Sequence, residues 1–332
     1  MIGSAPTSAV IICAFTERRW RDLLAAVESL SRQSQLPDEI VVVIDHNPEL
    51  HDRATAEFQS ARVVANEYPP GESGARNAGI ESTSAEVVAF MDDDAVADPE
   101  WLATLLSHYR DPQVVAVGGS VHPRWESGRP AGFPDEFDWV VGCTYRGMPT
   151  RCTAVRNVIG ANMSFRRSVF EVVGKFEDGI GRVGGGAGGC SETELCIRLG
   201  AMLPAAVILY EPAARVSHRV PSARMSWRYF GTRCFREGLS KAQVTQRAGC
   251  GPGLRCERAH ATRTIPLGVV RAVRSAITGD RAGLTRATAL VVGLWVTTIG
   301  FVVGRARYPA PRRARAREPR APANHALAGP AS

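Results

Sequence analysis

Short runs of aliphatic residues alternate with helical repeats along the first 125 residues of the chain. The aliphatic runs lie at residues 9–15, 39–45, 62–65, 86–91 and 114–122. Apolar residues recur at helical spacing in segments 20–33, 74–80 and 99–109. Uninterrupted aliphatic runs are typical of strands buried on both faces of a parallel sheet. The pattern predicts an α/β fold, doubly wound around a mostly parallel sheet, with ligands bound at the carboxyl ends of the strands.

The second half of the chain is less regular. Residues 192–199 are amphipathic and predict a short helix, and residues 206–210 predict a strand followed by a loop that carries His218. Residues 179–189 hold seven glycines in eleven positions. The Gly-Lys-Ser/Thr ending of a phosphate-binding loop is missing there. We therefore interpret this stretch as a mobile lid, and a plain linker is the alternative.

An uncharged segment, residues 289–304, precedes the C-terminal tail. Counted from Leu284 to Gly304 it approaches the length that spans a membrane, but Arg286 and four threonines within that count weaken it, and arginines flank it on both sides. A single span would place the arginine-rich tail outside, against the positive-inside rule. We expect a helix that lies in or dips into the inner leaflet, with residues 269–277 as an amphipathic partner. A buried core helix is the alternative.

Composition and charge divide the chain into unequal parts. Of the net charge of +7, residues 305–332 carry +6, from seven arginines and one glutamate. The remainder is nearly neutral, which argues against a nucleic-acid-binding face. The tail is rich in Pro, Ala and Arg and predicts disorder beside an anionic membrane surface. We expect a catalytic domain at 8–240, a membrane-associating helical region at 264–304 and a disordered tail at 305–332.

Three adjacent carboxylates, Asp92, Asp93 and Asp94, end the apolar run at 86–91. Like charges this close raise one another's pKa unless a cation lies among them. Mg²⁺ or Mn²⁺ is the natural partner for such oxygen ligands. The alternative is a solvated turn that caps the following helix. Thr16 and Asp45 also follow strands, so these side chains should converge on one crevice.

Five segments in this order resemble the inverting nucleotide-sugar glycosyltransferases of family 2. They lie at residues 10–18, 41–45, 74–79, 92–94 and 192–199. The resemblance covers about residues 8–240 and implies a Rossmann-like GT-A fold and a divalent metal. Residues 135–139, 142–147 and 159–163 further resemble family members that extend lipid-linked sugars, for instance by glucuronosyl transfer to a glucosyl-dolichyl phosphate. The Gln-x-x-Arg-Trp motif of processive synthases is missing, which argues against a polymerase.

The resemblance also implies roles for single residues. Asp45 matches the contact to the uracil of a UDP-sugar, and Thr16 and Glu17 match the segment that lines base and ribose. Arg76 matches an arginine near the base and diphosphate, and Asp92 a contact to ribose and sugar. The implied metal ligands are Asp94 and His218. Asp93 is included as a nucleotide-sugar contact because the motif could be aligned one residue away.

Glu192 is the catalytic base that the resemblance implies. The family pattern Glu-Asp-x-Glu reads Ser191-Glu192-Thr193-Glu194 here, so Glu192 occupies the Asp position and Glu194 is its rival. A helix N-terminus lowers the pKa of a carboxylate, so we expect Glu192 to be ionised, as a base requires.

These observations predict a metal-dependent enzyme that moves a sugar from a nucleotide sugar to a hydroxyl of a lipid-linked or glycan acceptor. It would act in cell-envelope glycan synthesis at the cytoplasmic face of the cell membrane. A sugar-1-phosphate nucleotidyltransferase is an alternative, but residues 14–19 lack the glycines of its phosphate loop. A degenerate transferase that serves as a membrane scaffold is another. The intact Asp45, Asp94 and Glu192 argue against it.

Overall fold

The computed structural model describes residues 6–179, 189–248 and 255–307 of the 332-residue chain. Most of the glycine-rich stretch at 179–189 lies outside the described residues. The same is true of most of the tail expected to be disordered. The boundaries expected at 240 and 264 remain predictions.

The first half of the sheet is parallel, as the aliphatic runs predict. Its strands are β1 (Ser8–Ala14), β2 (Glu39–Ile44), β3 (Arg62–Ala65) and β4 (Val87–Asp92), in the spatial order β3-β2-β1-β4. All three pairings among them are parallel. Nearly every residue of β1, β2 and β4 is buried, which explains the missing polar alternation.

The second half extends the same sheet with mixed pairing. Its strands are β5 (Ala95–Ala97), β6 (Val114–Trp125), β7 (Thr153–Ala154), β8 (Asn162–Arg166) and β9 (Val207–Val220). Strand β8 is inserted antiparallel between β4 and β6, and β6 pairs in parallel with β9. A bulge interrupts the last pairing, because Gly119 lies opposite Glu211 while Ser120 lies opposite Arg215.

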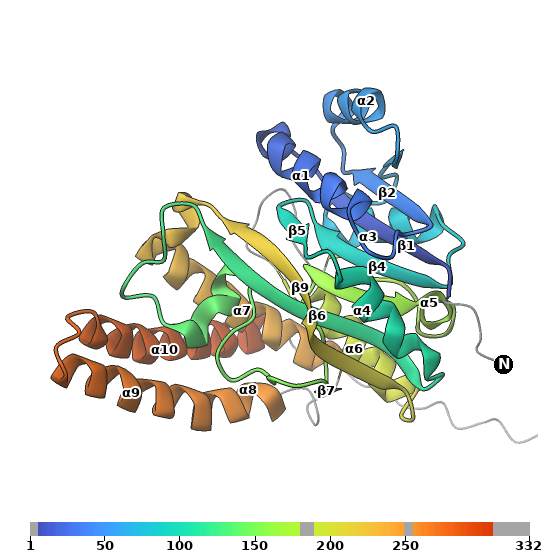
Figure 1. The fold of residues 1–332 in the computed structure, drawn as a ribbon. Helices are drawn as coiled ribbons and strands as arrows, with labels where there is room; N and C mark the ends of the chain where they lie inside the picture. The colour runs from blue at the N-terminus through green and yellow to red at the C-terminus, as the bar shows by residue number, and fades with distance from the viewer. Residues whose placement is uncertain (1–5, 180–188, 249–254, 308–332) are drawn as a thin grey trace, which may run out of the picture.

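Helices cover both faces of the sheet and create two cores (Figure 1). The first core packs α1 (Trp20–Ser31), α2 (Pro48–Glu57) and α4 (Trp101–Ser107) against one face. The second packs α3 (Glu72–Glu81), α5 (Arg167–Val173) and α6 (Ser191–Met202) against the other. Short turns of 3-10 helix lie at Glu17–Arg19, His108–Arg110, Asp135–Val141 and Ser222–Met225.

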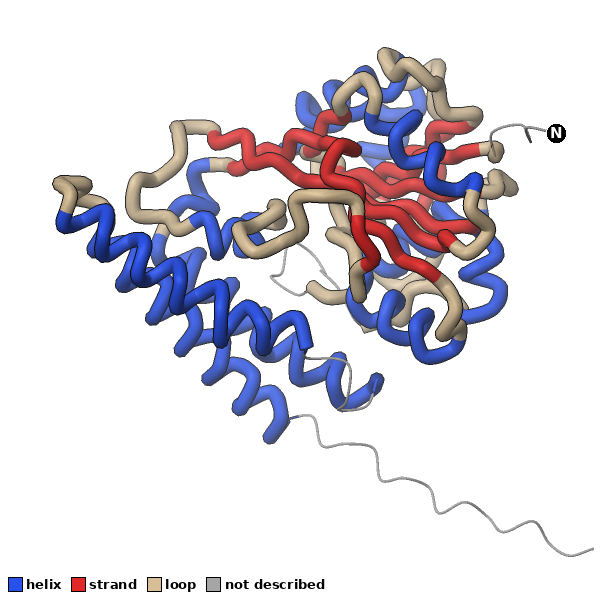
Figure 2. The backbone as a smooth tube through the Cα atoms, turned by 60° about the horizontal axis from the view of Figure 1, so that its bottom comes forward, coloured by secondary structure: helices blue, strands red, loops and turns tan. Residues whose placement is uncertain are grey.

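The C-terminal helices form a group beside the sheet (Figure 2). They are α7 (Trp227–Ala248), α8 (Arg255–Ala259), α9 (Ile265–Ile277) and α10 (Gly283–Arg307), with one π-helical stretch at His260–Thr264. Glycines bring α10 against α7 backbone to backbone. A Cβ added at Gly300 would lie 2.1 Å from the carbonyl oxygen of Phe235, and one at Gly238 would lie 2.1 Å from that of Thr297.

Apolar side chains cover the face of the α9–α10 hairpin that turns away from α7. Ile277 is 80% exposed and Trp295 is 67% exposed. Among the described residues, only α10 is long and apolar enough to cross a membrane. Its other exposed apolar side chains are Leu284, Val291, Val292, Ile299 and Val302. The expected C-terminal apolar helix is therefore present, and it pairs with the expected amphipathic helix.

Candidate active site

The residues at or just after the carboxyl ends of the parallel strands lie along one edge of the sheet. Thr16 follows β1, Asp45 follows β2, and Asp92 is the last residue of β4. His218 reaches the same edge from β9, where it lies opposite Ala95 of β5. The predicted loop position of His218 is therefore wrong. β9 continues past its bulge to Val220, and its ladder to β5 and β6 fixes the imidazole beside Asp94.

Asp92, Asp94 and His218 form a cluster that can hold a metal ion. Their ligand atoms all lie within 4.8 Å of one another. Nε2 of His218 is 3.0 Å from Oδ1 of Asp94 and 3.8 Å from Oδ2 of Asp92. Asp94 and His218 are buried and Asp92 is half-buried, so one side stays open to a ligand. Two carboxylates and one imidazole fit Mn²⁺ or Mg²⁺.

The charges within this cluster depend on one another. Burial alone would lower the pKa of His218, but contact with Asp94 outweighs it and raises that pKa to about 10. Burial alone would raise the pKa of Asp94, but His218 and Arg19 hold it well below its usual range. The negative charge of Asp94 therefore stabilises a positive partner, which is either the protonated imidazole or, once His218 has lost that proton, a bound cation.

Two arginines that the sequence did not single out approach the acidic run. Nη1 of Arg19 lies 2.6 Å from Oδ1 of Asp93 and 3.3 Å from Oδ2 of Asp94. Nη2 of Arg224 lies 3.7 Å from Oδ2 of Asp94. Asp93 is buried under Arg19, so the structure shows it holding a guanidinium group rather than open to a ligand. The planar guanidinium group of an arginine can donate two parallel hydrogen bonds to diphosphate oxygens.

The side chain of Asp45 is held in place by three neighbours. Its Oδ1 accepts hydrogen bonds from Nδ2 of Asn66 at 2.7 Å and from Nδ1 of His46 at 2.9 Å, and its Oδ2 accepts one from the amide of Gly71 at 2.9 Å. A carboxylate oxygen has two lone pairs, so Oδ2 keeps the capacity to accept a bond from a ligand.

Thr16 and Glu17 open the turn after β1. The hydroxyl of Thr16 accepts a bond from the amide of Arg18 at 3.4 Å and caps the 3-10 turn at Glu17–Arg19. Glu17 lines a cavity of about 430 Å³ together with Trp20 and Arg53. The segment is thus placed at the same edge as Asp45.

Arg76 extends from α3 and is buried against the start of α6. Its Nη1 donates to Oγ of Ser191 at 3.0 Å, and its Nη2 lies 2.5 Å from Oε1 of Glu72 and 3.3 Å from the carbonyl oxygen of Gly160. The charges of Asp92 and Glu192 both act on this guanidinium group. Arg76 therefore lies between the acidic end of β4 and the first turn of α6.

Glu192 and Glu194 occupy different surroundings on α6. Glu194 is buried and forms two 2.9 Å hydrogen bonds with Arg198. Glu192 is half-buried, and burial and the charge of Glu72 raise its pKa while Arg76 opposes them. The helix N-terminus predicted a lowered pKa for Glu192. That prediction is wrong, because loss of hydration outweighs the helix dipole and raises the pKa. A raised pKa makes the carboxylate of Glu192 a stronger proton acceptor than an ordinary glutamate.

A GT-A sheet with an Asp-x-Asp and histidine cluster at its carboxyl edge defines the class of protein, a glycosyltransferase. The chain belongs to glycosyltransferase family 2, since residues 9–174 match the model for Glycosyl transferase family 2.

Two curated relatives span part of the chain. Glucosyl-dolichyl phosphate glucuronosyltransferase of Haloferax volcanii is 38% identical over 236 residues, which is 70% of this chain and 75% of the relative. Pre-mycofactocin glycosyltransferase of Mycobacterium tuberculosis is 26% identical over 191 residues, which is 56% of this chain and 39% of that protein.

Two solved structures share the fold. A mannosyltransferase from Pyrobaculum calidifontis, in complex with GDP-Man and Mn²⁺, superposes with a TM-score of 0.57 at 17% identity, covering 91% of this chain and 86% of the other. GalNAc-T7 with UDP, GalNAc and Mn²⁺ gives 0.52 at 15% identity, covering 83% and 58%. The expected GT-A fold is confirmed.

Proposed function

We propose that this glycosyltransferase moves a sugar from a UDP-sugar to a hydroxyl of a lipid-linked sugar, with inversion at the anomeric carbon and with Mg²⁺ or Mn²⁺ bound. The placement of Arg76 carries the proposal. Its Nη2 and the Oε2 of Glu192 lie 2.9 Å and 3.6 Å from the position that a Cβ on Gly160 would take, and the charge of Asp92 also acts on the guanidinium group. The cluster that would hold the leaving group and the residue that would accept a proton therefore share one site.

The residues divide the reaction between them. Asp92, Asp94 and His218 would hold the cation, which supplies positive charge to the diphosphate leaving group. Arg19 and Arg224 add positive charge on the same side.

Glu192 accepts the proton of the acceptor hydroxyl while that oxygen forms the new bond to the anomeric carbon. The bond from that carbon to the phosphate oxygen breaks, and its electron pair leaves with UDP. Attack opposite the leaving group inverts the configuration, so no covalent sugar–enzyme intermediate is required.

The donor and acceptor are inferred from different features. Asp45 occupies the position that contacts uracil in the family pattern, which favours UDP. The relative at 38% identity is named for glucuronosyl transfer to a glucosyl-dolichyl phosphate, which favours glucuronate and a lipid-linked acceptor. One structural neighbour binds GDP-Man, so the guanine nucleotide is the competitor to test.

Membrane association is the remaining part of the proposal. Arginines flank the exposed apolar face of α9 and α10: Arg274 in the last turn of α9, Arg281 in the hairpin turn, and Arg305 and Arg307 at the end of α10. This charge pattern suits the anionic cytoplasmic leaflet. Because α10 packs backbone to backbone on α7, a transverse span would draw the charged α7 into the bilayer. We therefore favour a hairpin that lies in the membrane surface.

Donor screening by nucleotide release tests the function most directly. The purified protein, with Mn²⁺ and a glucosyl lipid phosphate, is supplied with UDP-glucuronate, UDP-glucose or GDP-mannose. We expect UDP release that EDTA abolishes and that Asp94→Asn abolishes without loss of the fold by circular dichroism. Full activity in EDTA, or turnover of GDP-mannose alone, would overturn the metal or the nucleotide assignment respectively.

A further inference from the structure

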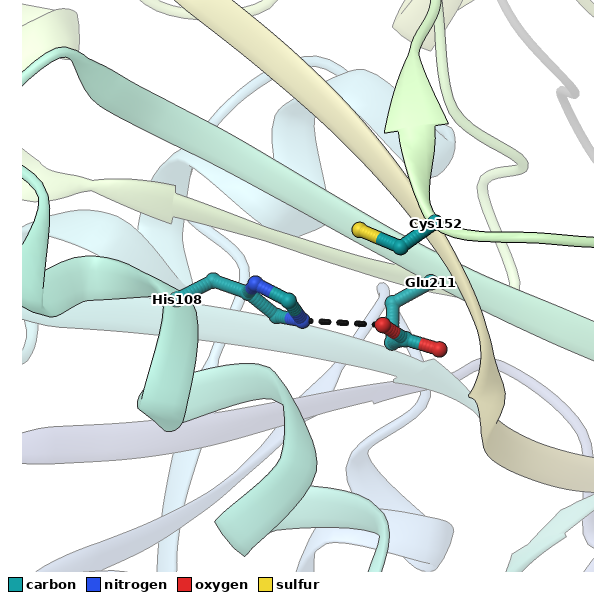
Figure 3. Close-up of side chains that lie close together, drawn as sticks. All are labelled: His108, Cys152 and Glu211. Carbon is teal, nitrogen blue, oxygen red and sulfur yellow. Dashed lines mark hydrogen bonds and ion pairs between the residues drawn. The ribbon is translucent and has the colours of Figure 1, made fainter.

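A second group of metal-ligand side chains lies away from the active site. Figure 3 shows His108, Cys152 and Glu211 turned toward one another. Their ligand atoms lie within 4.8 Å of one another, and Nε2 of His108 is 3.0 Å from Oε2 of Glu211. Glu211 lies opposite Gly119, and His218 lies opposite Pro123. Those partners are four residue steps apart along β6, which is about 13 Å at a rise of ~3.3 Å per residue.

The fold builds this cluster from three distant segments. Strand β7 pairs antiparallel with β9, with Thr153 opposite Tyr210, so the same register sets Cys152 opposite Glu211. Directly opposite residues share one face of a sheet. His108 follows α4, which packs on β9. Oε1 of Glu211 accepts the amide of Ala213 at 2.9 Å inside the bulge, which orients the carboxylate.

The donor set indicates which ion would bind. A thiolate, an imidazole and a carboxylate together match the ligands of Zn²⁺, with a fourth tetrahedral position left for water. The Asp92–Asp94–His218 cluster has no thiolate and suits harder cations. The two groups therefore select different metals.

A cysteine nucleophile is the alternative use of these three residues. Such a nucleophile needs a lowered thiol pKa and an imidazole that faces it. Here the imidazole of His108 contacts Glu211 instead, with Nε2 3.0 Å from Oε2. This geometry argues against nucleophilic catalysis.

We propose that His108, Cys152 and Glu211 bind Zn²⁺ and that the ion holds residues 143–161, here called the strap, against the sheet. The strap joins both sides of the active site. At one end, Sγ of Cys143 lies 3.9 Å from Nδ1 of His218. Near the other end, the carbonyl of Gly160 accepts from Arg76. Cys152 lies midway, so an ion there would order the strap without taking part in the reaction.

Cobalt substitution tests the site in the full-length protein, reduced with a non-chelating phosphine. Co²⁺ should give a thiolate-to-metal charge-transfer band in the near ultraviolet. The band should disappear in Cys152→Ser and weaken in His108→Gln, and it should survive in Asp92→Asn, the matched control in the other cluster. Zn²⁺ affinity in Cys152→Ser should fall by at least the roughly 10-fold that loss of an outer-shell partner costs.

Hydrogen exchange then tests the effect on the strap. Zn²⁺ should slow exchange at residues 143–161 in the wild type and leave Cys152→Ser unchanged. Cys152 is exposed and serine is nearly isosteric, so this variant should keep its fold, which circular dichroism checks. No charge-transfer band in the wild type, or an undiminished band in Cys152→Ser, would overturn the site. Zn²⁺ binding without added protection would overturn the ordering of the strap.

Discussion

Two carboxylates in the first turn of one helix, Glu192 and Glu194 of α6, can differ in chemistry because of what surrounds them. Arg198 binds Glu194 on both oxygens and also donates to the carbonyls of Val173 and Lys175. Glu194 is therefore part of a packed ion pair. Glu192 faces Glu72 and Arg76 instead, and its raised pKa suits proton transfer.

Glu192→Gln should slow single-turnover transfer by about two to four orders of magnitude, since glutamine keeps the size of the side chain but cannot accept the proton. UDP binding, measured by titration calorimetry, should persist. Glu194→Gln is the matched control, and it should lower the melting temperature because Arg198 loses its charged partner. Wild-type turnover by Glu192→Gln with a dead Glu194→Gln would move the base by two residues.

The rate should also depend on pH through Glu192. A base must be ionised, so kcat/KM should rise with pH through the pKa of Glu192, and the acidic limb should lie above the ordinary glutamate value of 4.5. Glu72→Gln removes a charge that raises this pKa, so the limb should move to lower pH. A limb that stays in place, or moves upward, in the kcat/KM profile would contradict this assignment.

At the scale of elements, the sequence was most informative where burial was complete. The aliphatic runs at 39–45 and 86–91 agree with the buried strands β2 and β4 to within a residue, and the run at 62–65 matches β3, an edge strand that is only partly buried. Helix α2 was missed because its signals are an Asn47 cap and Pro48 at its start rather than a long apolar repeat.

The full extent of strand β9 and the positions of the arginines in the site could not be predicted from the sequence. Residues 211–215 look like a loop because the bulge breaks the alternation there, so His218 was placed in a loop. Arg19 and Arg224 reach Asp94 from turns far apart in the chain, and no local pattern encodes such a meeting. The His108–Cys152–Glu211 cluster lacks ligand spacing in sequence for the same reason.

The close packing of α7 on α10 predicts opposite effects for two glycine-to-alanine changes. Gly300→Ala places a methyl group against the carbonyl of Phe235, which as backbone cannot turn aside, and should cost roughly 1–3 kcal/mol of unfolding free energy. Gly231→Ala, on α7 with open space around it, should stabilise by about 0.5–1 kcal/mol. Urea unfolding measures both, and equal effects would contradict backbone contact at Gly300.

At the scale of the whole molecule, the proposed membrane association would make the α9–α10 hairpin the part that holds the enzyme at the lipid surface. The double variant Ile277→Glu/Trp295→Glu should lose flotation with anionic vesicles, since both side chains are exposed on the apolar face. Leu36→Glu, also an exposed apolar residue but outside the hairpin, is the matched control and should float normally. Unchanged flotation of the double variant, or protease cleavage of the tail outside intact cells, would contradict a hairpin in the inner surface.

The glycine contacts between α7 and α10 have a consequence for the choice of acceptor. Helix α7 also packs against α6, whose first turn carries Glu192. With α10 resting in the lipid, the catalytic carboxylate would stand at a set height above the membrane plane. The enzyme would then select acceptors by their length. A sugar whose lipid and phosphate place it at that height would be glycosylated, and the hydroxyl of a shorter or longer acceptor would not reach the base.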